Sequence, residues 1–301
     1  MSDEIGWDLY RSFLGVLQAG SLSGAARALD LTQPTVGRHI SALERALGLA
    51  LFTRSQTGLK ATDAALELRG HAETMRSSAS ALRRAAEGHG VGVSGTVRVS
   101  ASEVIGVEVL PPIVAALQAA HPALKIELVA TNRVQDLLRR EVDLAVRMTQ
   151  PTQELLVARR VGHVALGLHA HKRYLARRGT PRTLDELTEH TLIGHDEETP
   201  FLRAARKALP VWSRAALSIR TDSDLGQLAM IRAGAGIGVC QVALARREPS
   251  LVRVLPKQFE HRLETWITMH EDLRNSRRCK VTFDALVAGM AAHASWPPAT
   301  S

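Results

Sequence analysis

Two helical patterns follow each other between residues 21 and 47 with almost nothing between them. Behind Ser21, a candidate N-cap, the first keeps the spacing of one apolar helix face with Leu22, Ala25, Ala26 and Leu29. The second tolerates Pro34 near its start and keeps the same spacing with Val36, Ile40, Leu43 and Leu47. Only residues 30–32 separate the two, so we expect the helices to cross at a sharp angle. This arrangement predicts a helix-turn-helix.

The outward face of the second predicted helix carries short polar side chains and two longer arms: Gln33, Thr35, Gly37, Arg38 and His39. Such a face can enter a DNA major groove. The following residues 51–62 contain Gly58, Arg54 and Lys60, which predicts a β-wing with Arg54 near a minor groove or a phosphate. By pattern alone, an ordinary helical hairpin on a protein surface is the alternative.

The run from Trp7 to Thr62 resembles the N-terminal winged helix of LysR-type transcriptional regulators, on the segments SLSGAARAL, LTQPTVGRHISALERALG and LFTR. The resemblance implies sequence-specific binding of double-stranded operator DNA. The residues implied to contact it are Ser23, Thr32, Gln33, Pro34, Thr35, Gly37, Arg38, His39 and Arg54. Gly37 departs from the family, which usually has serine there, so one donor toward DNA is missing.

Net charge alone does not identify a nucleic-acid partner. The whole chain carries +8, but residues 1–90 hold ten Lys/Arg against nine Asp/Glu. Positive charge is concentrated only locally, with five basic and two acidic side chains in 27–60. The first ten residues are acidic, unlike a signal peptide, and no apolar run approaches the roughly 18 residues of a membrane span. We therefore expect a cytoplasmic protein with no membrane partner.

After the wing, a long helix is predicted from residues 62–63 onward. Apolar residues recur at alternating spacings of three and four, as in a heptad seam: Ala65, Leu68, Ala72, Met75, Ala79 and Leu82. The resemblance implies a dimerising linker helix, whereas a solvated helix lying on its own domain is the alternative. A glycine-rich stretch at 88–95 then marks a domain boundary. We expect a winged helix-turn-helix domain at 1–62, a linker helix at 63–90 and a regulatory domain at 91–301.

From Thr96 the pattern alternates between strands and helices, which predicts a parallel α/β sheet. Strands are expected at 96–101, 124–130, 143–148, 164–170, 217–221, 236–240 and 264–270. Helices are expected at 102–119 with an interruption at Pro111 and Pro112, at 134–140, 184–189 and 223–233, and at the C-terminal end with Leu286, Val287 and Met290 on one face.

This half resembles the family's periplasmic-binding-protein-like effector domain, on VLPPIVAALQAAHPALKIEL, LLRREVDLAVRM and RAGAGIGVC. Cys240 and Gln241 stand where the family usually has Leu-Pro. The resemblance implies lobe I at about 91–162 and 270–301, lobe II at about 163–269, and crossover strands near 161–168 and 264–270. The predicted fold class is thus α/β, with an all-α-rich N-terminal winged helix-turn-helix, a long linker helix and a two-lobed effector domain.

Small ligands in such folds bind between the lobes, at the carboxyl ends of strands and at helix N-termini. The candidates are Ser100, Ser102, Glu103, Thr131, Asn132, Arg147, Thr149, His195, Asp222 and Ser223. The small carboxylates and aromatic acids that the resemblance implies fit Arg147 as a counter-ion, with Ser102 and Ser223 opening helices toward an anion. Glu103 argues instead for a neutral or cationic ligand. Each residue taken singly also has a structural interpretation, as a helix cap or as an ion pair.

No pattern indicates catalysis, a metal or a cofactor, and we expect none. The glycines at 234–238 lie between a helix and a strand, the reverse of the order in a dinucleotide-binding loop. The HDEE run at 195–198 points adjacent side chains in different directions, so an exposed acidic loop is favoured over a metal site.

Three functions compete at this point. The leading one is an effector-controlled regulator acting as a dimer or tetramer and recruiting RNA polymerase. A second is a thiol sensor using Cys240 with Cys279, although Cys240 lies in an apolar stretch that favours burial. The third belongs to another class, a solute-binding module or an enzyme built on the α/β half, and the presence of residues 1–90 argues against it.

Overall fold

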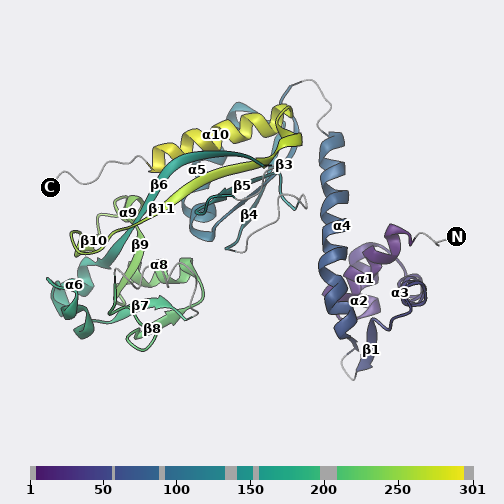
Figure 1. Cartoon of the computed structure of the whole chain (residues 1–301), viewed down its shortest axis with the longest axis horizontal. Helices are drawn as coiled ribbons and strands as arrows, with labels where there is room; N and C mark the ends of the chain where they lie inside the picture. The colour runs from purple at the N-terminus through teal and green to yellow at the C-terminus, as the bar shows by residue number, and fades with distance from the viewer. Residues whose placement is uncertain are drawn as a thin grey trace. The chain divides into compact units, whose positions relative to one another are not determined.

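The computed structural model describes residues 5–55, 58–87, 92–132, 141–151, 156–196 and 209–294. The chain divides into two compact units, residues 1–83 with 139–141 and residues 84–138 with 142–301 (Figure 1). The predicted helix-turn-helix and wing lie in the first unit, and the alternating strands and helices lie in the second. Over the described residues, no helix is long and apolar enough to cross a bilayer.

The first unit begins with three short helices: α1 (Trp7–Ala19), α2 (Leu22–Leu29) and α3 (Gln33–Leu47). The predicted cap is confirmed at Ser21, whose hydroxyl accepts the Gly24 N–H at 3.1 Å. The helix α1 ends at its C-cap Gly20, whose φ of 65° favours glycine. Gly6 is the N-cap of α1, and Asp8 lies in the first turn, where its charge complements the helix dipole.

The predicted wing is confirmed as an antiparallel pair of strands, β1 (Phe52–Ser55) and β2 (Gly58–Ala61). The Glu44 carboxylate on α3 accepts the N–H groups of Leu51 at 2.7 Å and of Phe52 at 3.2 Å, so the start of the wing is fixed to α3. The buried core under these elements includes Phe13, Val16, Ala25, Ala26, Val36, Ile40, Leu43 and Leu51. These contacts orient α3 and the wing relative to each other.

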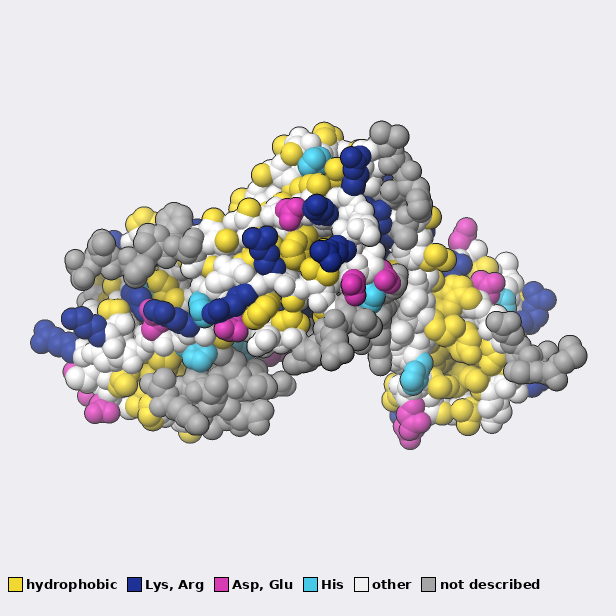
Figure 2. All heavy atoms as spheres, turned by 45° about the horizontal axis from the view of Figure 1, so that its top comes forward, with side chains coloured by type: hydrophobic (Ala, Val, Ile, Leu, Met, Phe, Trp, Pro, Cys, Tyr) yellow, Lys and Arg dark blue, Asp and Glu magenta, His cyan; other side chains and the backbone are white. Residues whose placement is uncertain are grey.

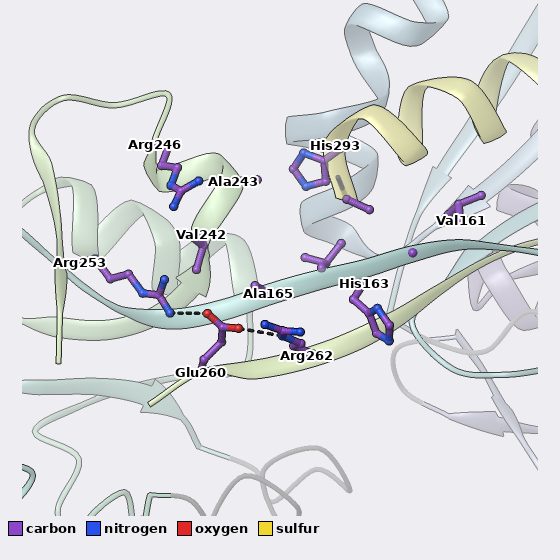
Figure 3. A pocket seen from close by; sticks show the side chains of 13 residues that line it. Val161, His163, Ala165, Val242, Ala243, Arg246, Arg253, Glu260, Arg262 and His293 are labelled. Carbon is purple, nitrogen blue, oxygen red and sulfur yellow. Dashed lines mark hydrogen bonds and ion pairs between the residues drawn. The ribbon is translucent and has the colours of Figure 1, made fainter. Parts of the chain in front are cut away.

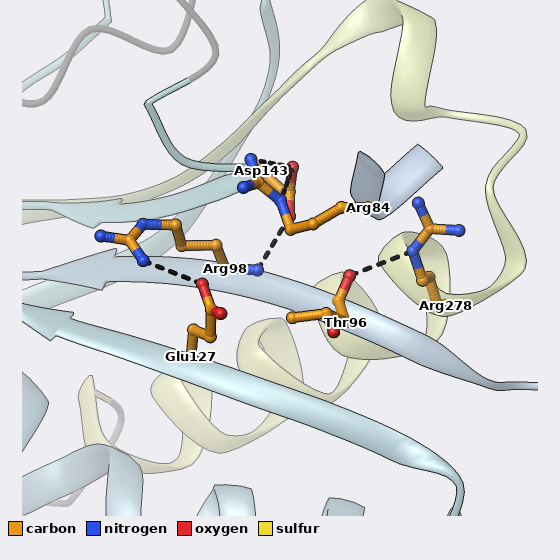
Figure 4. Close-up of polar contacts among 6 residues, drawn as sticks. All are labelled: Arg84, Thr96, Arg98, Glu127, Asp143 and Arg278. Carbon is orange, nitrogen blue, oxygen red and sulfur yellow. Dashed lines mark hydrogen bonds and ion pairs between the residues drawn. The ribbon is translucent and has the colours of Figure 1, made fainter. Parts of the chain in front are cut away.

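The predicted long helix is α4 (Asp63–Glu87). Its last turn belongs to the second unit, where Arg84 is buried and its Nε lies 3.0 Å from Asp143 Oδ2 (Figure 4). Asp143 also accepts the backbone N–H of Arg98 at 2.8 Å. The end of α4 is therefore fixed within the second unit by a buried, hydrogen-bonded ion pair.

One mixed sheet runs through the second unit in the order β4-β3-β5-β11-β6-β9-β7-β8, with β10 also paired to β6. Lobe I contains the parallel strands β3 (Gly95–Ala101), β4 (Leu124–Ala130) and β5 (Leu144–Arg147), with η1 (Ile105–Val109), α5 (Leu110–Ala120) and α10 (Arg277–Ala294). Lobe II contains the parallel strands β7 (Leu192–His195), β8 (Ile219–Thr221) and β9 (Ile237–Gln241), with β10 (Leu251–Val254), α6 (Lys172–Arg178), η2 (Asp185–Glu189), α8 (Asp224–Arg232) and α9 (Val242–Ala245).

Two long strands join the lobes: β6 (Leu156–His171) and β11 (His261–His270), which pair antiparallel along the whole length of β11 (Figure 1). The predicted crossovers are thus confirmed. The prediction of a parallel sheet holds for β3, β4 and β5 and for β7, β8 and β9. It is wrong for the whole sheet, because β6, β10 and β11 pair antiparallel with their neighbours. The short 3-10 helix η3 (Glu271–Leu273) follows β11.

Several elements differ from the sequence prediction. The strands β7 and β10 and the helix α6 were not predicted, and the helix expected at 184–189 is the 3-10 turn η2. The helix expected at 102–119 contains the π-turn η1 before Pro111, which has no N–H to continue the α-helical ladder. The helix expected at 134–140 lies outside the described residues.

Candidate functional site

The outward face of α3 presents polar groups at its N-terminal end. Gln33, Pro34 and Arg38 are exposed. The Thr32 hydroxyl caps the helix by accepting the Thr35 N–H at 3.3 Å, and the two threonine hydroxyls lie 2.8 Å apart. Arg38 Nη2 reaches the Thr35 hydroxyl at 3.5 Å, so the guanidinium lies over the first turns of the helix. These side chains form one polar surface at the start of α3.

Two residues of α3, His39 and Gly37, do not add a side chain to this polar surface. His39 Nδ1 lies 2.7 Å from the hydroxyl of the fully buried Ser12 on α1, so the imidazole joins α3 to α1. A Cβ added at Gly37 would meet only Leu22 Cδ1, at 3.7 Å, an ordinary contact. Packing therefore leaves room for the serine that the family resemblance leads one to expect at Gly37.

The other residues implied to contact DNA lie on α2 and on the wing. Ser23 on α2 is exposed. Arg54 is exposed on β1 and pairs with Leu59 of β2. Lys60 is exposed on β2 opposite Thr53. The wing therefore carries two cationic side chains in solvent.

The predicted seam of α4 has two different halves. Ala65 and Ala72 are buried in the core of the first unit and Leu68 packs against them. Further along, Ala79 is exposed, Met75 is 40% exposed and Leu82 is 74% exposed. The first half thus packs inside its own unit, and the second half leaves apolar side chains in solvent.

In lobe I, two of the predicted effector residues contact each other at the ends of β3 and β5. Arg147 Nη2 donates to the hydroxyl of the buried Ser100 at 2.7 Å, and Nη1 donates to the Val146 carbonyl at 3.0 Å. Burial lowers the pKa of the guanidinium, although it remains charged. Ser102 is half-buried just after β3. The half-buried Thr131 donates its N–H to the Ala101 carbonyl at 2.8 Å, and Thr149 is exposed.

A polar network crosses from lobe I to lobe II at the strand ends. In the side chain of Asn132, Oδ1 accepts the backbone N–H of Glu103 at 3.1 Å, and Nδ2 donates to Asp224 Oδ2 at 2.8 Å. Asp224 Oδ1 lies 2.6 Å from His195 Nε2. In parallel, the Ser223 hydroxyl donates to Glu103 Oε2 at 3.3 Å and also caps α8. Four predicted residues, Glu103, Asn132, His195 and Ser223, are therefore brought together with Asp224; we call these five residues the cleft network.

The charges in the cleft network support one another. The hydrogen bond to Asp224 raises the pKa of His195 against the opposing effect of burial. Burial works to raise the pKa of Asp224, but the hydrogen bond and charge of His195, with the Asn132 amide, outweigh it and the pKa is lowered. Near neutral pH both shifts favour an imidazolium facing a carboxylate.

Sequence reasoning missed two parts of the link between the lobes. It selected Asp222, which is exposed, instead of Asp224 two residues later. It also missed Glu108 of lobe I, whose carboxylate receives both Nη groups of Arg232 of α8 at 2.7 and 2.8 Å. The position of Asp224 in the first turn of α8, directly after a serine cap, was the available signal.

Two family descriptions match the sequence. The LysR substrate binding domain covers residues 90–291, and the bacterial regulatory helix-turn-helix protein of the lysR family covers residues 7–66. The chain belongs to the LysR family of bacterial regulators. It is a DNA-binding transcriptional regulator with an effector-binding domain.

Known LysR-family proteins resemble the chain along most of its length. The HTH-type transcriptional regulator YhjC of Escherichia coli K12 is 27% identical over 254 residues, which are 81% of this chain and 84% of that protein. The virulence activator AphB of Vibrio cholerae has a similar fold, with a TM-score of 0.62 at 20% identity over 94% of this chain and 99% of that one. CbnR in complex with its target DNA gives a TM-score of 0.68 at 18% identity, over 94% and 99% of the two chains.

The cysteines do not suit a redox role in this LysR-family protein. Cys240 and Cys279 are both buried, and burial raises the pKa of Cys240 to about 12 and also raises that of Cys279. A sensing thiol needs exposure and a lowered pKa, so the structure argues against the thiol-sensor alternative.

The HDEE run also has a structural role where it is described. His195 bonds to Asp224, and Asp196 pairs with Arg214 at 2.7 Å. Residues 197–198 lie outside the described part. Among the described residues, no group of three His, Cys, Asp or Glu side chains could hold a metal ion.

Proposed function

We propose that this regulator binds operator DNA as a dimer or as a tetramer. We further propose that a small effector bound in the cleft changes how the two lobes are held together. The observation that carries the proposal is the cleft network, in which Asn132 and Glu103 of lobe I bond directly to Asp224 and Ser223 of lobe II. A ligand that replaces these bonds must alter the balance between lobe arrangements. We assign the protein no catalytic step and no cofactor, and RNA polymerase is the expected partner once DNA is bound.

We propose that the N-terminal end of α3 reads the major groove. Arg38 and Gln33 supply the long exposed side chains there, and Thr32, Pro34, Thr35 and Gly37 border them. Arg54 and Ser23 would contact the DNA backbone from the wing and from α2. His39, held by Ser12, would position α3 more than it contacts a base. CbnR, which has the same fold, has been solved with its target DNA.

The test is a gel-shift series on the intergenic DNA upstream of the gene. Replacing Arg38 by Ala should weaken specific binding by about 1–3 kcal/mol, the value of a bidentate contact to a base, and should affect random DNA much less. Arg45→Ala is the matched control, because Arg45 is exposed in the last turn of the same helix. Equal losses for Arg38→Ala and Arg45→Ala would refute the assignment of the groove-facing end.

For the effector we propose a small carboxylate. Burial of the Arg147 guanidinium works against its charge, and an incoming anion would offset that cost. Ser100 fixes the guanidinium at the end of β5, and Ser102 lies just after the neighbouring strand β3. The acidic members of the cleft network are already engaged with His195, Asn132 and Ser223, so they compete less with a bound acid than isolated carboxylates would.

The effector class is tested by thermal unfolding against a panel of small acids and amines, since a ligand of the folded state raises the melting temperature. We expect acids to raise it and Arg147→Gln to abolish the increase while operator binding is kept. If amines raise it instead, and Glu103→Gln is the variant that loses the response, the carboxylate assignment is wrong.

A further inference from the structure

A hollow of about 350 Å³ lies beside the crossover strands in the second unit, and it shares no lining residue with the cleft network. Its walls come from residues 161–165 of β6, from α9 and β10 of lobe II, from the start of β11, and from the end of α10 of lobe I (Figure 3). Both lobes and both crossover strands therefore contribute to this one hollow, which we call the hinge hollow because it lies where the crossover strands join the lobes.

Guanidinium groups dominate the charge of this hollow. Arg246, Arg253 and Arg262 line it, and Glu260 is the acidic residue among its lining side chains. The Glu260 carboxylate accepts hydrogen bonds from Arg253 Nη2 and from Arg262 Nε, both at 2.8 Å (Figure 3). The lining thus holds three guanidinium groups and one carboxylate, which leaves it with excess positive charge.

His293 adds no charge to the opposite wall. Arg247 can only donate, so its contact at 3.2 Å makes Nδ1 of His293 the acceptor. Nε2 therefore carries the proton and donates to Gln241 Oε1 at 2.9 Å. Burial, with the nearby Arg247 charge, lowers the pKa of His293 to about 4, which agrees with a neutral ring. The positive character of the hollow thus comes from its arginines.

Arg253 retains donor capacity that the described residues do not use. Its Nε is buried and has no hydrogen-bond partner among the described residues. It lies over Gly167, 3.0 Å from the point where a Cβ would stand, so a side chain at that position would displace the guanidinium. A buried N–H without an acceptor is costly, and an anion beside the guanidinium would reduce that cost.

Apart from His163, the rest of the lining is small or apolar: Val161, Gly162, Val164, Ala165, Val242, Ala243 and Ala294. Arg246 and Arg253 beside these apolar side chains suit a carboxylate joined to a short apolar body, because the planar guanidinium forms paired hydrogen bonds with a carboxylate. We propose that this hollow binds a small organic carboxylate and that its occupation favours one arrangement of the two lobes. Binding here does not require the cleft to bind a ligand.

The test measures the binding of benzoate to the full-length protein by calorimetry. All measurements are made in the Arg147→Gln background, so that an anion site in the cleft does not contribute. We expect benzoate to bind to Arg147→Gln, and the added change Arg246→Gln to weaken that binding at least tenfold. Arg253→Gln should do the same, but it also removes the bond from Arg253 to Glu260, so Arg246→Gln is the decisive variant.

Arg214→Gln is the matched control, because Arg214 is an exposed arginine of lobe II that does not line the hollow. It should leave benzoate binding unchanged. Three results would overturn the proposal: no benzoate binding in the Arg147→Gln background up to about ten millimolar, equal losses with Arg246→Gln and Arg214→Gln, or inorganic phosphate binding as tightly as benzoate. The last result would mean that charge alone, and not the apolar side chains, selects the ligand.

Discussion

The imidazole of His195 lies where the two lobes meet, and its proton strengthens the bond that Asp224 accepts. The surrounding carboxylates of Asp224, Glu103 and Asp222 all act to raise its pKa. Because Asp224 in turn bonds to Asn132 of lobe I, the charge on one side chain affects the connection between the lobes. The chemistry of the cleft is therefore sensitive to protons as well as to ligands.

A pH dependence follows for this residue. A pKa that is raised in the folded state contributes stability that is fully present below the ordinary histidine value of about 6.5 and is lost as pH rises through the folded value. We expect His195→Gln to lower the free energy of unfolding by about 1 kcal/mol at pH 5.5, and by progressively less toward pH 9. Urea unfolding of both proteins at several pH values measures this difference.

The control for that series is Asp224→Asn, which keeps the size of the side chain and removes its charge. It should reproduce the same pH-dependent part of the difference, because both changes remove the pair of His195 and Asp224. The altered contact of residue 224 with Asn132 adds a loss that does not depend on pH over this range. A difference that stays constant from pH 5.5 to pH 9 would show that His195 does not gain a proton-dependent partner in the folded state.

Among the elements, the helix α4 has two halves that differ in what their apolar seam residues contact. Its first half supports the core around Phe13 and Leu43, which explains why Ala65 and Ala72 are small and buried. Its second half exposes Met75 and Leu82, and apolar side chains in a row on an exposed helix favour contact with another helix. We propose that a second copy of the chain covers this second half.

Charge placed on that half should break the assembly. Leu82→Glu or Met75→Glu would put an unpaired carboxylate into the contact, which is strongly unfavourable. We expect smaller particles by light scattering and weaker operator binding, because two half-sites would no longer be bound by one dimer. Leu66→Glu is the control, since Leu66 is 54% exposed on another face of the same helix. Particles of unchanged size for Leu82→Glu would contradict the proposal.

Two ion pairs near the end of α4 differ in burial and should therefore differ in their contribution to stability. Arg84 and Asp143 are almost fully buried, whereas the nearby pair Arg98 and Glu127 is largely exposed (Figure 4). Arg84→Met would leave the Asp143 carboxylate buried without its partner and should cost about 3–5 kcal/mol of stability in urea unfolding. Arg98→Ala should cost less than about 1 kcal/mol. Similar costs for the two variants would mean that Asp143 finds other partners.

The sequence allowed the long elements to be predicted, because their periodicity is strong and their caps are local. The caps at Ser21 and Ser223 depend on residues three positions away, and both are found in the structure. The strands β7 and β10 span four residues each, too short to show an alternating pattern. Their place in the sheet is decided by partners far along the chain, which no local pattern reveals.

At the scale of the whole molecule, partners that are distant in sequence also decide which cleft residues could be predicted and which were missed. The expectation that strand ends gather polar residues correctly selected Glu103, Asn132, His195 and Ser223. It could not decide between Asp222 and Asp224, because only the tertiary arrangement shows which carboxylate turns toward His195. The hinge hollow was not predicted, since its arginines come from three separate elements.

The two crossover strands also determine when the chain can finish folding. Lobe I contains β3 near residue 95 and α10, which ends at Ala294, and β11 pairs with both β5 and β6. On the ribosome, β3, β4 and β5 are made long before β11 and α10 exist to cover them. Their apolar faces must wait for nearly the whole chain to emerge, and such distant pairing is slow and exposed to aggregation. The N-terminal helices, whose partners are all close in sequence, can fold while the rest is still being synthesised.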